Sequence, residues 1–212
     1  KPEPIERSVE YIKETDIQQA VDMINECSRP FVFVGGGAVI SDAEEELKIF
    51  VDKLHAPVAD SLMGKGAYSG ENEMYCGMLG MHGTKAANLG VTKCDLLITV
   101  GSRFSDRVVG QAKSFAKNAK IIQIDVDPAE IGKNLGTTVP LVGDVHVIFE
   151  NLLQYEIPGD YTAWNEELAE KKAAYVDRRH FNPDFVNPCR FVQTLSSKMN
   201  DDAIYVADVG QN

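Results

Sequence analysis

The sequence predicts an α/β fold in which a parallel sheet carries helices on both faces. Short apolar runs alternate with amphipathic segments of helical period through residues 15–157. The runs are apolar on both faces, as strands buried between two helical layers must be. Most of them end in glycine or in an acidic residue, which is typical of a turn from a strand into a helix. These observations indicate a Rossmann-like arrangement.

The predicted elements follow in order along the chain. The segment DIQQAVDMINECSRP is predicted to form a helix that Asp16 caps. A strand at residues 31–34 runs into Gly35–Gly37, and the next helix begins with a capping box of Ser41 and Glu44. Further strands are predicted at residues 57–60, 95–100, 120–124 and 139–142. Thr84 is predicted to cap a helix through Ala86 and Ala87, and Asp144 is predicted to cap the helix that follows the strand at 139–142.

The character of the sequence changes after Leu153. Residues 158–187 are highly charged with a helical middle, and residues 188–212 predict one more helix and a strand at 204–207. A final strand with no helix to cover it indicates a fragment that stops just inside another domain. We therefore expect four parts: an incoming linker at 1–14, a central domain at 15–157, a charged connector at 158–187, and the start of a C-terminal domain at 188–212.

The composition excludes several classes of protein. The 212 residues include 21 basic and 32 acidic side chains, for a formal net charge of -11. This charge disfavours nonspecific binding to nucleic acid or to an anionic membrane. No apolar run approaches the roughly 20 residues that span a bilayer, and the N-terminus has no signal-peptide core. The four cysteines form no CxxC pair, so we expect reduced thiols in the cytoplasm.

Glycine and acidic residues gather at the predicted strand ends. Ligands of open parallel sheets bind outside the carboxyl ends of the strands, near the point where the strand order reverses. Glycine lets backbone N–H groups approach a phosphate, and a carboxylate can accept hydrogen bonds from ribose. The strand ends concerned are Gly35–Gly37, Gly101–Arg103, Asp125–Asp127 and Gly143–Asp144, joined by the glycine-spaced stretch GMLGMHGT at residues 77–84. Together they predict a nucleotide or dinucleotide site.

Each of these features also has a simpler interpretation. Residues 35–40 carry only the first two glycines of a GxGxxG fingerprint, so they could form an ordinary tight turn. Asp125 and Asp127 could simply start the short helix after Pro128. Asp144 could be only a helix cap, and Arg103 and Arg107 could be surface charges. A histidine such as His82 is more often hydrogen-bonded or packed than catalytic. No paired carboxylates, Ser-His-Asp order or metal-ligand spacing stands out, so the sequence predicts a binding site without a catalytic set.

The ordered motifs VGGGA, LMGKGAY, GMLGMHGT, GSRFSDRVVG, IDVDPAEIGKN and VGDV identify a resemblance. Over about residues 15–155 the chain resembles the middle domain of the acetohydroxyacid synthase (acetolactate synthase) large subunit, in the thiamine-diphosphate enzyme family. The resemblance implies condensation of two pyruvates, or of pyruvate and 2-ketobutyrate, with decarboxylation, in branched-chain amino-acid biosynthesis. It also implies a mainly structural FAD in this domain, thiamine diphosphate and Mg²⁺ in the whole enzyme, a homodimer or tetramer, and a small regulatory subunit as a possible partner.

The resemblance also assigns contacts residue by residue. The end of the chain would contact thiamine diphosphate through Val209, Gln211 and Asn212, and Met81 and Arg107 match positions near the mouth of the substrate channel. The implied FAD contacts are Gly35, Gly36, Gly37, Ser61, Leu62, Met63, Leu79, Gly80, Met81, His82, Gly83, Thr84, Gly101, Ser102, Arg103, Arg107, Val108, Asp125, Val126, Glu130, Gly143, Asp144 and Val145.

Two residues depart from the family pattern. Ser105 stands where an aspartate is usual, and Lys65 stands where a leucine is common, which would bring a charge near the flavin. The catalytic glutamate of the family and its magnesium motif GDG belong to domains that these residues do not include. The resemblance therefore implies that this part alone has no catalytic residue and is not active by itself.

Other functions remain compatible with the same residues. Within the superfamily, glyoxylate carboligase or a pyruvate oxidase with a redox-active flavin would use the same domain. A nonenzymatic scaffold with a vestigial nucleotide pocket would serve subunit assembly instead. An NAD-dependent deacylase on a related sheet needs a pair of CxxC motifs, which the sequence lacks.

Overall fold

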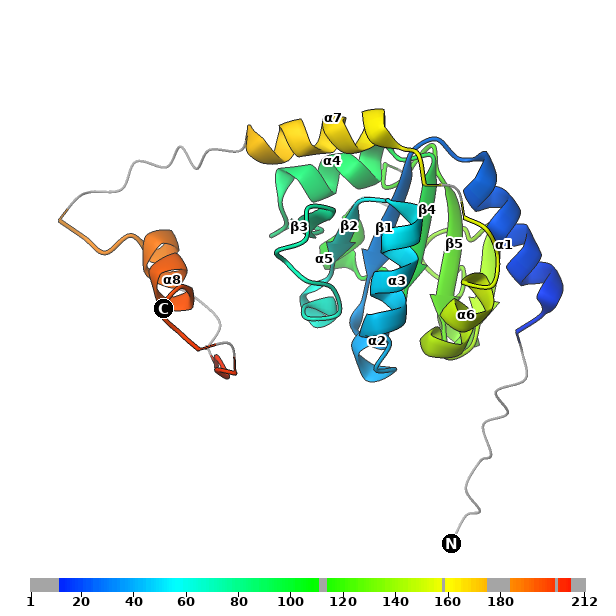
Figure 1. Ribbon diagram of the computed structural model, residues 1–212, viewed down its shortest axis with the longest axis horizontal. Coiled ribbons are helices and arrows are strands. Elements are labelled where there is room, and N and C mark those ends of the chain that lie inside the picture. The colour runs from blue at the N-terminus through cyan, green and yellow to red at the C-terminus, as the bar shows by residue number, and fades with distance from the viewer. Residues whose placement is uncertain (1–11, 111–113, 158, 175–183, 201, 207–212) are drawn as a thin grey trace, which may run out of the picture. The chain divides into compact units, whose positions relative to one another are not determined.

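The computed structural model describes residues 12–110, 114–157, 159–174, 184–200 and 202–206. The chain divides into two compact units, residues 1–175 and residues 176–212. The first unit contains the sheet, and Figure 1 shows the strands running from its upper edge to its lower edge.

A six-stranded parallel sheet forms the centre of the first unit. Its order is β3-β2-β1-β4-β5-β6, and every neighbouring pair is parallel. The sequence prediction of a parallel sheet is confirmed. The strands are β1 (Pro30–Val34), β2 (Val58–Asp60), β3 (Tyr75–Met78), β4 (Leu96–Val100), β5 (Lys120–Asp125) and β6 (Val139–Val142).

The strand order reverses between β1 and β4. The chain moves outward from β1 through β2 to β3, then returns to place β4 on the other side of β1. β1 and β4 are buried along their whole length, as expected for central strands that helices cover on both faces. Their registers align Val34 with Val100, so both strands finish at the same level and their following loops lie side by side.

Helices cover both faces of the sheet (Figure 1). Phe50 of α3 and Phe149 of α6 pack with ring centroids 5.0 Å apart, and α1 also contacts α6. On the other face, Gly90 of α4 lies directly against the ring of Phe31 in β1. The helices of the sheet are α1 (Glu14–Glu26), α2 (Gly36–Ile40), α3 (Glu44–Leu54), α4 (Lys85–Lys93), α5 (Asp106–Val109) and α6 (Val145–Leu152), with short 3-10 turns η1 (Leu62–Gly64) and η2 (Pro128–Glu130).

Two of the predicted helix caps are confirmed. The Thr84 side chain accepts a hydrogen bond from the Ala87 N–H at the start of α4. The Asp144 carboxylate accepts one from the His146 N–H at the start of α6. Each cap satisfies a backbone donor that the helix itself leaves without a partner.

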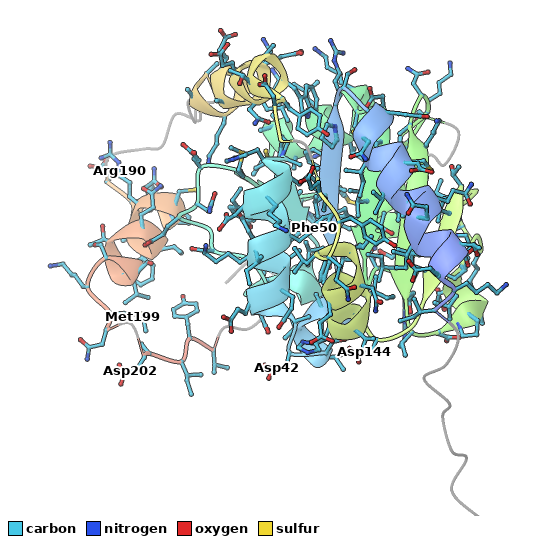
Figure 2. The ribbon with its side chains drawn as sticks, turned by 45° about the vertical axis from the view of Figure 1, so that its right-hand side comes forward. Asp42, Phe50, Asp144, Arg190, Met199 and Asp202 are labelled. Carbon is cyan, nitrogen blue, oxygen red and sulfur yellow. The ribbon has the colours of Figure 1, made fainter. Side chains whose placement is uncertain are left out.

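The other two predicted caps are wrong. α1 begins at Glu14, before Asp16, and Lys13 at its N-cap makes no side-chain hydrogen bond. The expected capping box does not form, because the Ser41 hydroxyl instead donates to the Gly37 carbonyl in the one-turn helix α2. Ser41 therefore ends α2, Asp42 turns the chain with φ 53°, and α3 starts later. Asp42 and Asp144 both lie at the end of the unit where the strands finish (Figure 2).

Helix α7 (Thr162–Ala173) crosses the opposite end of the sheet, at the top of Figure 1. Its Trp164 indole N–H donates to the Pro30 carbonyl at 2.9 Å, and Leu168 is also buried. Asn165 donates to the carbonyl of His55 at 2.8 Å, and Lys172 to that of Tyr75 at 2.7 Å. These carbonyls lie where β1, β2 and β3 begin. α7 is therefore tied to the amino ends of three strands.

The second unit contains α8 (Pro188–Ser196), which Asn187 caps by accepting from the Arg190 N–H. The strand expected at 204–207 is not present in residues 204–206, and Ala207 lies outside the described residues. A strand needs a neighbour to pair with, and the described part of this unit offers none. Phe185, Val186, Phe191, Ile204 and Val206 are exposed there. No helix in the described parts of the chain is long and apolar enough to cross a membrane.

Candidate functional site at the carboxyl ends of the strands

The loops after β1 and β4 meet where the strand order reverses. The Gly35 N–H donates to the Val100 carbonyl at 2.7 Å, and the Gly37 N–H to the Gly101 carbonyl at 3.0 Å. The Gly101 N–H in turn donates to the Ile124 carbonyl at 2.8 Å, which joins the loop after β4 to the end of β5. The predicted glycine loops are thus continuous along one edge of the sheet.

Backbone packing explains most of these glycines. A Cβ atom at Gly35 would lie 2.2 Å from the Gly101 oxygen, and one at Gly37 would lie 2.6 Å from the Gly101 Cα. Gly101 itself has φ +58°, a conformation that glycine adopts without strain. The N–H groups of Gly35 and Gly37 are used inside the protein, so their first role is to let two loops pack together.

Gly36 differs from its two neighbours. It begins α2, and its N–H donates to no acceptor among the described residues. A Cβ atom there would lie 3.0 Å from the Cβ of Met63 in the loop after β2. Of the three glycines, Gly36 therefore presents a free backbone donor at the edge of the sheet, as a phosphate site would require.

The loop after β2 carries Ser61, Leu62 and Met63. The Ser61 N–H donates to the Val34 carbonyl at 2.8 Å, and its hydroxyl oxygen accepts from the Gly64 N–H at 3.1 Å. The loop holds Leu62 at 70% and Met63 at 74% exposure. Exposure of two large apolar side chains on a braced loop favours an interaction surface.

The stretch GMLGMHGT forms the end of β3 and the turn into α4. Gly80 has φ +107°, and a Cβ there would lie 2.6 Å from the Arg107 carbonyl, which accepts from the Met81 N–H at 3.0 Å. The backbone that comes close to this stretch is therefore that of Arg107 and Val108. Met81 is 67% exposed. His82 is exposed and makes no hydrogen bond or ion pair with any residue in the described ranges.

Two asparagines brace these loops, and the sequence analysis missed both. The Asn88 amide group donates to the Gly80 carbonyl at 3.0 Å and accepts from the Gly80 N–H at 3.3 Å. The Asn134 amide group donates to the carbonyls of Arg103 and Phe104 at 3.0 and 3.2 Å. It holds Phe104, which has φ 50°, in a conformation that costs about 1 kcal/mol or more without support.

Two cationic side chains lie at the same edge. Arg103 and Arg107 are exposed, and neither forms an ion pair with a described residue. Burial raises the pKa of the Asp125 carboxyl, and the positive charge of Arg103 acts against that rise. In a chain with a net charge of -11, free arginines beside exposed apolar side chains favour an anionic ligand with an apolar part.

The loop after β5 brings a buried carboxyl group to the edge. Asp125 is 7% exposed, and burial raises its pKa, while a hydrogen bond from the Asp127 N–H at 3.0 Å acts against that rise. Ser102, in the loop after β4, is also buried, and Val126 is 58% exposed. Glu130 is engaged with Lys133, 2.9 Å away, and is therefore less available to a ligand.

The loop after β6 completes the edge. The Gly143 N–H donates to the Asp125 carbonyl at 3.1 Å, and a Cβ at Gly143 would lie 2.9 Å from the Ile12 side chain. One oxygen of Asp144 is used as the cap of α6, and Val145 is buried. This loop therefore contributes mainly its backbone.

The structure brings the predicted contacts from Gly35 to Val145 together at one edge of the sheet. The remaining three, Val209, Gln211 and Asn212, lie outside the described residues. Sequence reasoning also missed Asp60, a buried carboxylate at the end of β2, although it is the one charged residue of the predicted strand at 57–60. Among the described residues, no cluster of three or more histidine, cysteine or acidic side chains could hold a metal ion.

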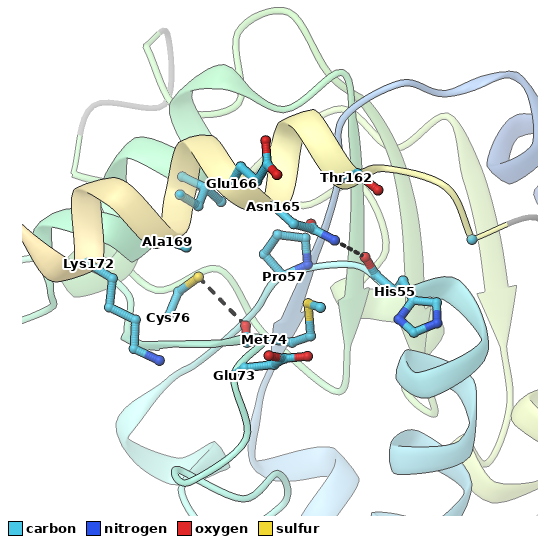
Figure 3. Close-up of a pocket in the computed structure, with 12 residues that line it drawn as sticks. His55, Pro57, Glu73, Met74, Cys76, Thr162, Asn165, Glu166, Ala169 and Lys172 are labelled. Carbon is cyan, nitrogen blue, oxygen red and sulfur yellow. Dashed lines mark hydrogen bonds between the residues drawn. The ribbon is translucent and has the colours of Figure 1, made fainter.

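A separate groove lies at the other end of the sheet, under α7 (Figure 3). Its volume is about 410 Å³, and its lining includes Pro57, Met74, Cys76, Asn165 and Ala169. Cys76 donates to the Met74 carbonyl there, and Asn165 reaches the His55 carbonyl. None of the glycine loops or free arginines reaches this groove, so the candidate site remains the carboxyl-end edge.

A parallel sheet whose glycine loops meet at the reversal of strand order defines a Rossmann-like α/β domain. The family described as "Thiamine pyrophosphate enzyme, central domain" matches residues 17–152, and the chain belongs to this family. The family resemblance found in the sequence is thereby confirmed.

The chain is similar to acetolactate synthase large subunits. It is 43% identical to the "Probable acetolactate synthase large subunit" of Methanocaldococcus jannaschii, over 92% of this chain and 35% of that protein. It is 39% identical to the protein named acetolactate synthase large subunit in Porphyra purpurea, over 97% and 36% of the two chains. The corresponding protein of Corynebacterium glutamicum is 41% identical, over 92% and 32%. The chain spans about a third of the length of these curated relatives.

Proposed function

We propose that this chain is part of an acetolactate synthase large subunit, in which its central domain holds a structural FAD. The whole protein would join two pyruvates, or pyruvate and 2-ketobutyrate, with loss of carbon dioxide. Similarity to relatives that carry this name supports the reaction. The observation that carries the flavin proposal is the row of glycine loops, free arginines and exposed apolar side chains at the carboxyl-end edge.

The residues at this edge fit the parts of FAD. The free N–H of Gly36 and the guanidinium groups of Arg103 and Arg107 suit a diphosphate. The buried Asp125 carboxyl suits ribose hydroxyls, which donate hydrogen bonds. Exposed Leu62, Met63 and Met81 would regain cover from an apolar ring system.

The proposed flavin is structural, because joining two 2-keto acids with loss of carbon dioxide involves no net oxidation or reduction. Thiamine diphosphate, held with Mg²⁺, would supply the carbon nucleophile. Val209, Gln211 and Asn212 are the contacts with it that we propose in this chain. The residues of the central domain bind and orient, and we assign none of them to a chemical step.

Further features of the proposal concern the whole protein. The name "large subunit" in the relatives supports a smaller regulatory partner. We also propose a homodimer or tetramer of catalytic subunits, a cytoplasmic location, and a role in branched-chain amino-acid biosynthesis. Size measurement of the purified protein by light scattering tests the oligomer directly.

The test of the activity uses the intact polypeptide with pyruvate, thiamine diphosphate and Mg²⁺, with and without FAD. We expect acetolactate and carbon dioxide in equal amounts, with activity lost when FAD is removed and restored when it is added. Absence of acetolactate would refute the proposal. Condensation of glyoxylate would instead identify a carboligase of different specificity, and electron transfer to an acceptor would identify an oxidase.

A second measurement separates an enzyme from an assembly scaffold. We expect one FAD per chain after gel filtration of the intact protein. The variants Arg103→Gln and Arg107→Gln should retain less FAD. Lys48→Gln is the matched control, because Lys48 is an exposed cation that pairs with Asp52 on α3, away from the site. A protein that binds no FAD and has no activity would support the scaffold.

A further inference from the structure

A polar cluster lies directly behind the loop that presents Leu62 and Met63. Asp60 ends β2 and is only 3% exposed. One carboxylate oxygen accepts a hydrogen bond from the Tyr75 hydroxyl at 2.8 Å. The other oxygen, Oδ1, is buried without a hydrogen-bond partner among the described residues and lies 3.6 Å from the Lys65 ammonium nitrogen. A buried carboxylate needs such a cation, because burial of an unpaired charge is strongly unfavourable.

Lys65 contacts both partners of this cluster. Its ammonium group donates to the Tyr75 hydroxyl at 3.3 Å and lies 6.0 Å from the centre of the Tyr75 ring. Burial, followed by the hydrogen bond to Asp60, raises the pKa of Tyr75, so this hydroxyl stays protonated as the donor. The lysine that departs from the family pattern therefore points back to β2 and β3. Its ammonium group pairs with Asp60 and Tyr75, while the Lys65 side chain stays half exposed.

The cluster brackets the loop at both ends. Asp60 immediately precedes Ser61, and Lys65 immediately follows Gly64, so their ion pair closes the loop across its base. Backbone contacts with Val34 hold both ends of the loop, through the Ser61 N–H and the close approach of Gly64. The chain then passes through Gly66, which has φ +98°, in a turn that the Ala67 N–H closes onto the Gly64 carbonyl at 3.1 Å. Lys65 is thus the side-chain anchor at the point where the loop enters this turn.

We propose that Lys65 is a positioning residue for the cofactor, acting through the loop Ser61–Gly64. Its pairing with Asp60 and Tyr75 holds Leu62 and Met63 where they cover the apolar ring system. Met63 is also the neighbour of Gly36, so the same anchor sets the spacing between two loops of the site. This inference rests on the proposed function and adds a residue that positions the site's loop without contacting the cofactor.

The test measures the FAD dissociation constant, the melting temperature without FAD, and kcat at saturating FAD in the intact protein. We expect Lys65→Met to raise the dissociation constant about tenfold while kcat at saturation stays unchanged. Lys65→Arg should stay within about twofold of the wild type, because it keeps the cation. Asp60→Asn combined with Lys65→Met should recover part of the affinity, because a neutral amide needs no counter-charge. Lys48→Met, which removes an exposed lysine of α3, should change none of these values.

Three outcomes would overturn the inference. If Lys65→Met binds FAD as tightly as the wild type does, the loop needs no anchor. The proposed function would still stand in that case, because the wild-type protein binds FAD. A fall in kcat at saturating FAD would assign Lys65 to the chemistry. Failure of Lys65→Arg to restore affinity would show that charge pairing is irrelevant. A wild-type protein that binds no FAD would instead refute the proposed function itself.

Discussion

The glycines at the reversal of strand order can serve loop packing or close approach to a phosphate, and alanine variants distinguish these two roles. If Gly37 serves loop packing, Gly37→Ala should destabilise the protein even without a cofactor. If Gly37 serves only close approach to a phosphate, the same change should lower FAD affinity and leave stability unchanged. The structure favours the first role for Gly37 and the second for Gly36.

The distances give the expected magnitude. A Cβ at Gly37 would lie 2.6 Å from the Gly101 Cα, against an ordinary contact of 3.4 Å or more, so the two loops must move apart. Such overpacking costs about 1–3 kcal/mol, and loss of the Gly37–Gly101 hydrogen bond costs about 1 kcal/mol more. Alanine returns about 1 kcal/mol, because Gly37 lies in the short helix α2. We expect a net loss of about 2 kcal/mol, which lowers the melting temperature by about 4–8 °C.

The assay compares three alanine variants by thermal unfolding of the intact polypeptide without FAD and by FAD titration. Gly36→Ala meets the Met63 Cβ at 3.0 Å, a contact that a small shift relieves, so it should lose FAD affinity but little stability. Gly136→Ala is the control, because nothing lies within 4 Å of its Cβ position. A Gly37→Ala protein with the wild-type melting temperature and weakened FAD binding would refute the packing argument.

Three further predictions concern other parts of the molecule. Burial raises the pKa of Asp125 in the folded state, so ionisation of this carboxyl destabilises the fold as the pH rises. Asp125→Asn should therefore raise the melting temperature at pH 7. It should not do so near pH 3, where Asp125 is protonated in both the folded and the unfolded protein. Trp164→Phe removes the donor to the Pro30 carbonyl and should lower the melting temperature by about 2–4 °C, for a loss of about 1 kcal/mol; an unchanged value would mean that water replaces the indole. His82→Ala should weaken FAD retention without changing stability, because the imidazole is exposed; lost turnover with normal FAD binding would make His82 catalytic.

The sequence predicted the features that depend on neighbours along the chain. β1, β2 and β4 to β6 were predicted because each is a short apolar run next to turn signals. Thr84 and Asp144 were recognised because a cap acts within three residues. β3 was missed because Tyr75–Met78 is a partly exposed edge strand containing a glycine. The capping box at Ser41 failed because α2, a second local structure, competes for that serine.

The shared location of the candidate site residues was predictable, whereas their contacts were not. The glycines and acids at the predicted strand ends lie at one edge of the sheet, since parallel strands bring their carboxyl ends together. Asn134 acts on Phe104 across 30 residues of sequence, and no local pattern reveals such a pairing. Lys65 was expected to face the ligand, whereas in the structure its ammonium group turns to Asp60. A side chain's direction depends on tertiary contacts that a motif does not contain.

The ties made by α7 bear on where this folding unit ends. The region that matches the family ends at residue 152. Beyond it, α7 supplies donors to the carbonyls of Pro30, His55 and Tyr75 at the start of three strands. A polypeptide shortened to the family boundary would expose those carbonyls and the surfaces that Trp164 and Leu168 cover. The family match therefore ends before α7, whereas the folded unit includes α7. The folded unit is longer by one helix, and a protease that cut between residue 153 and α7 would loosen the sheet from the end opposite to the site.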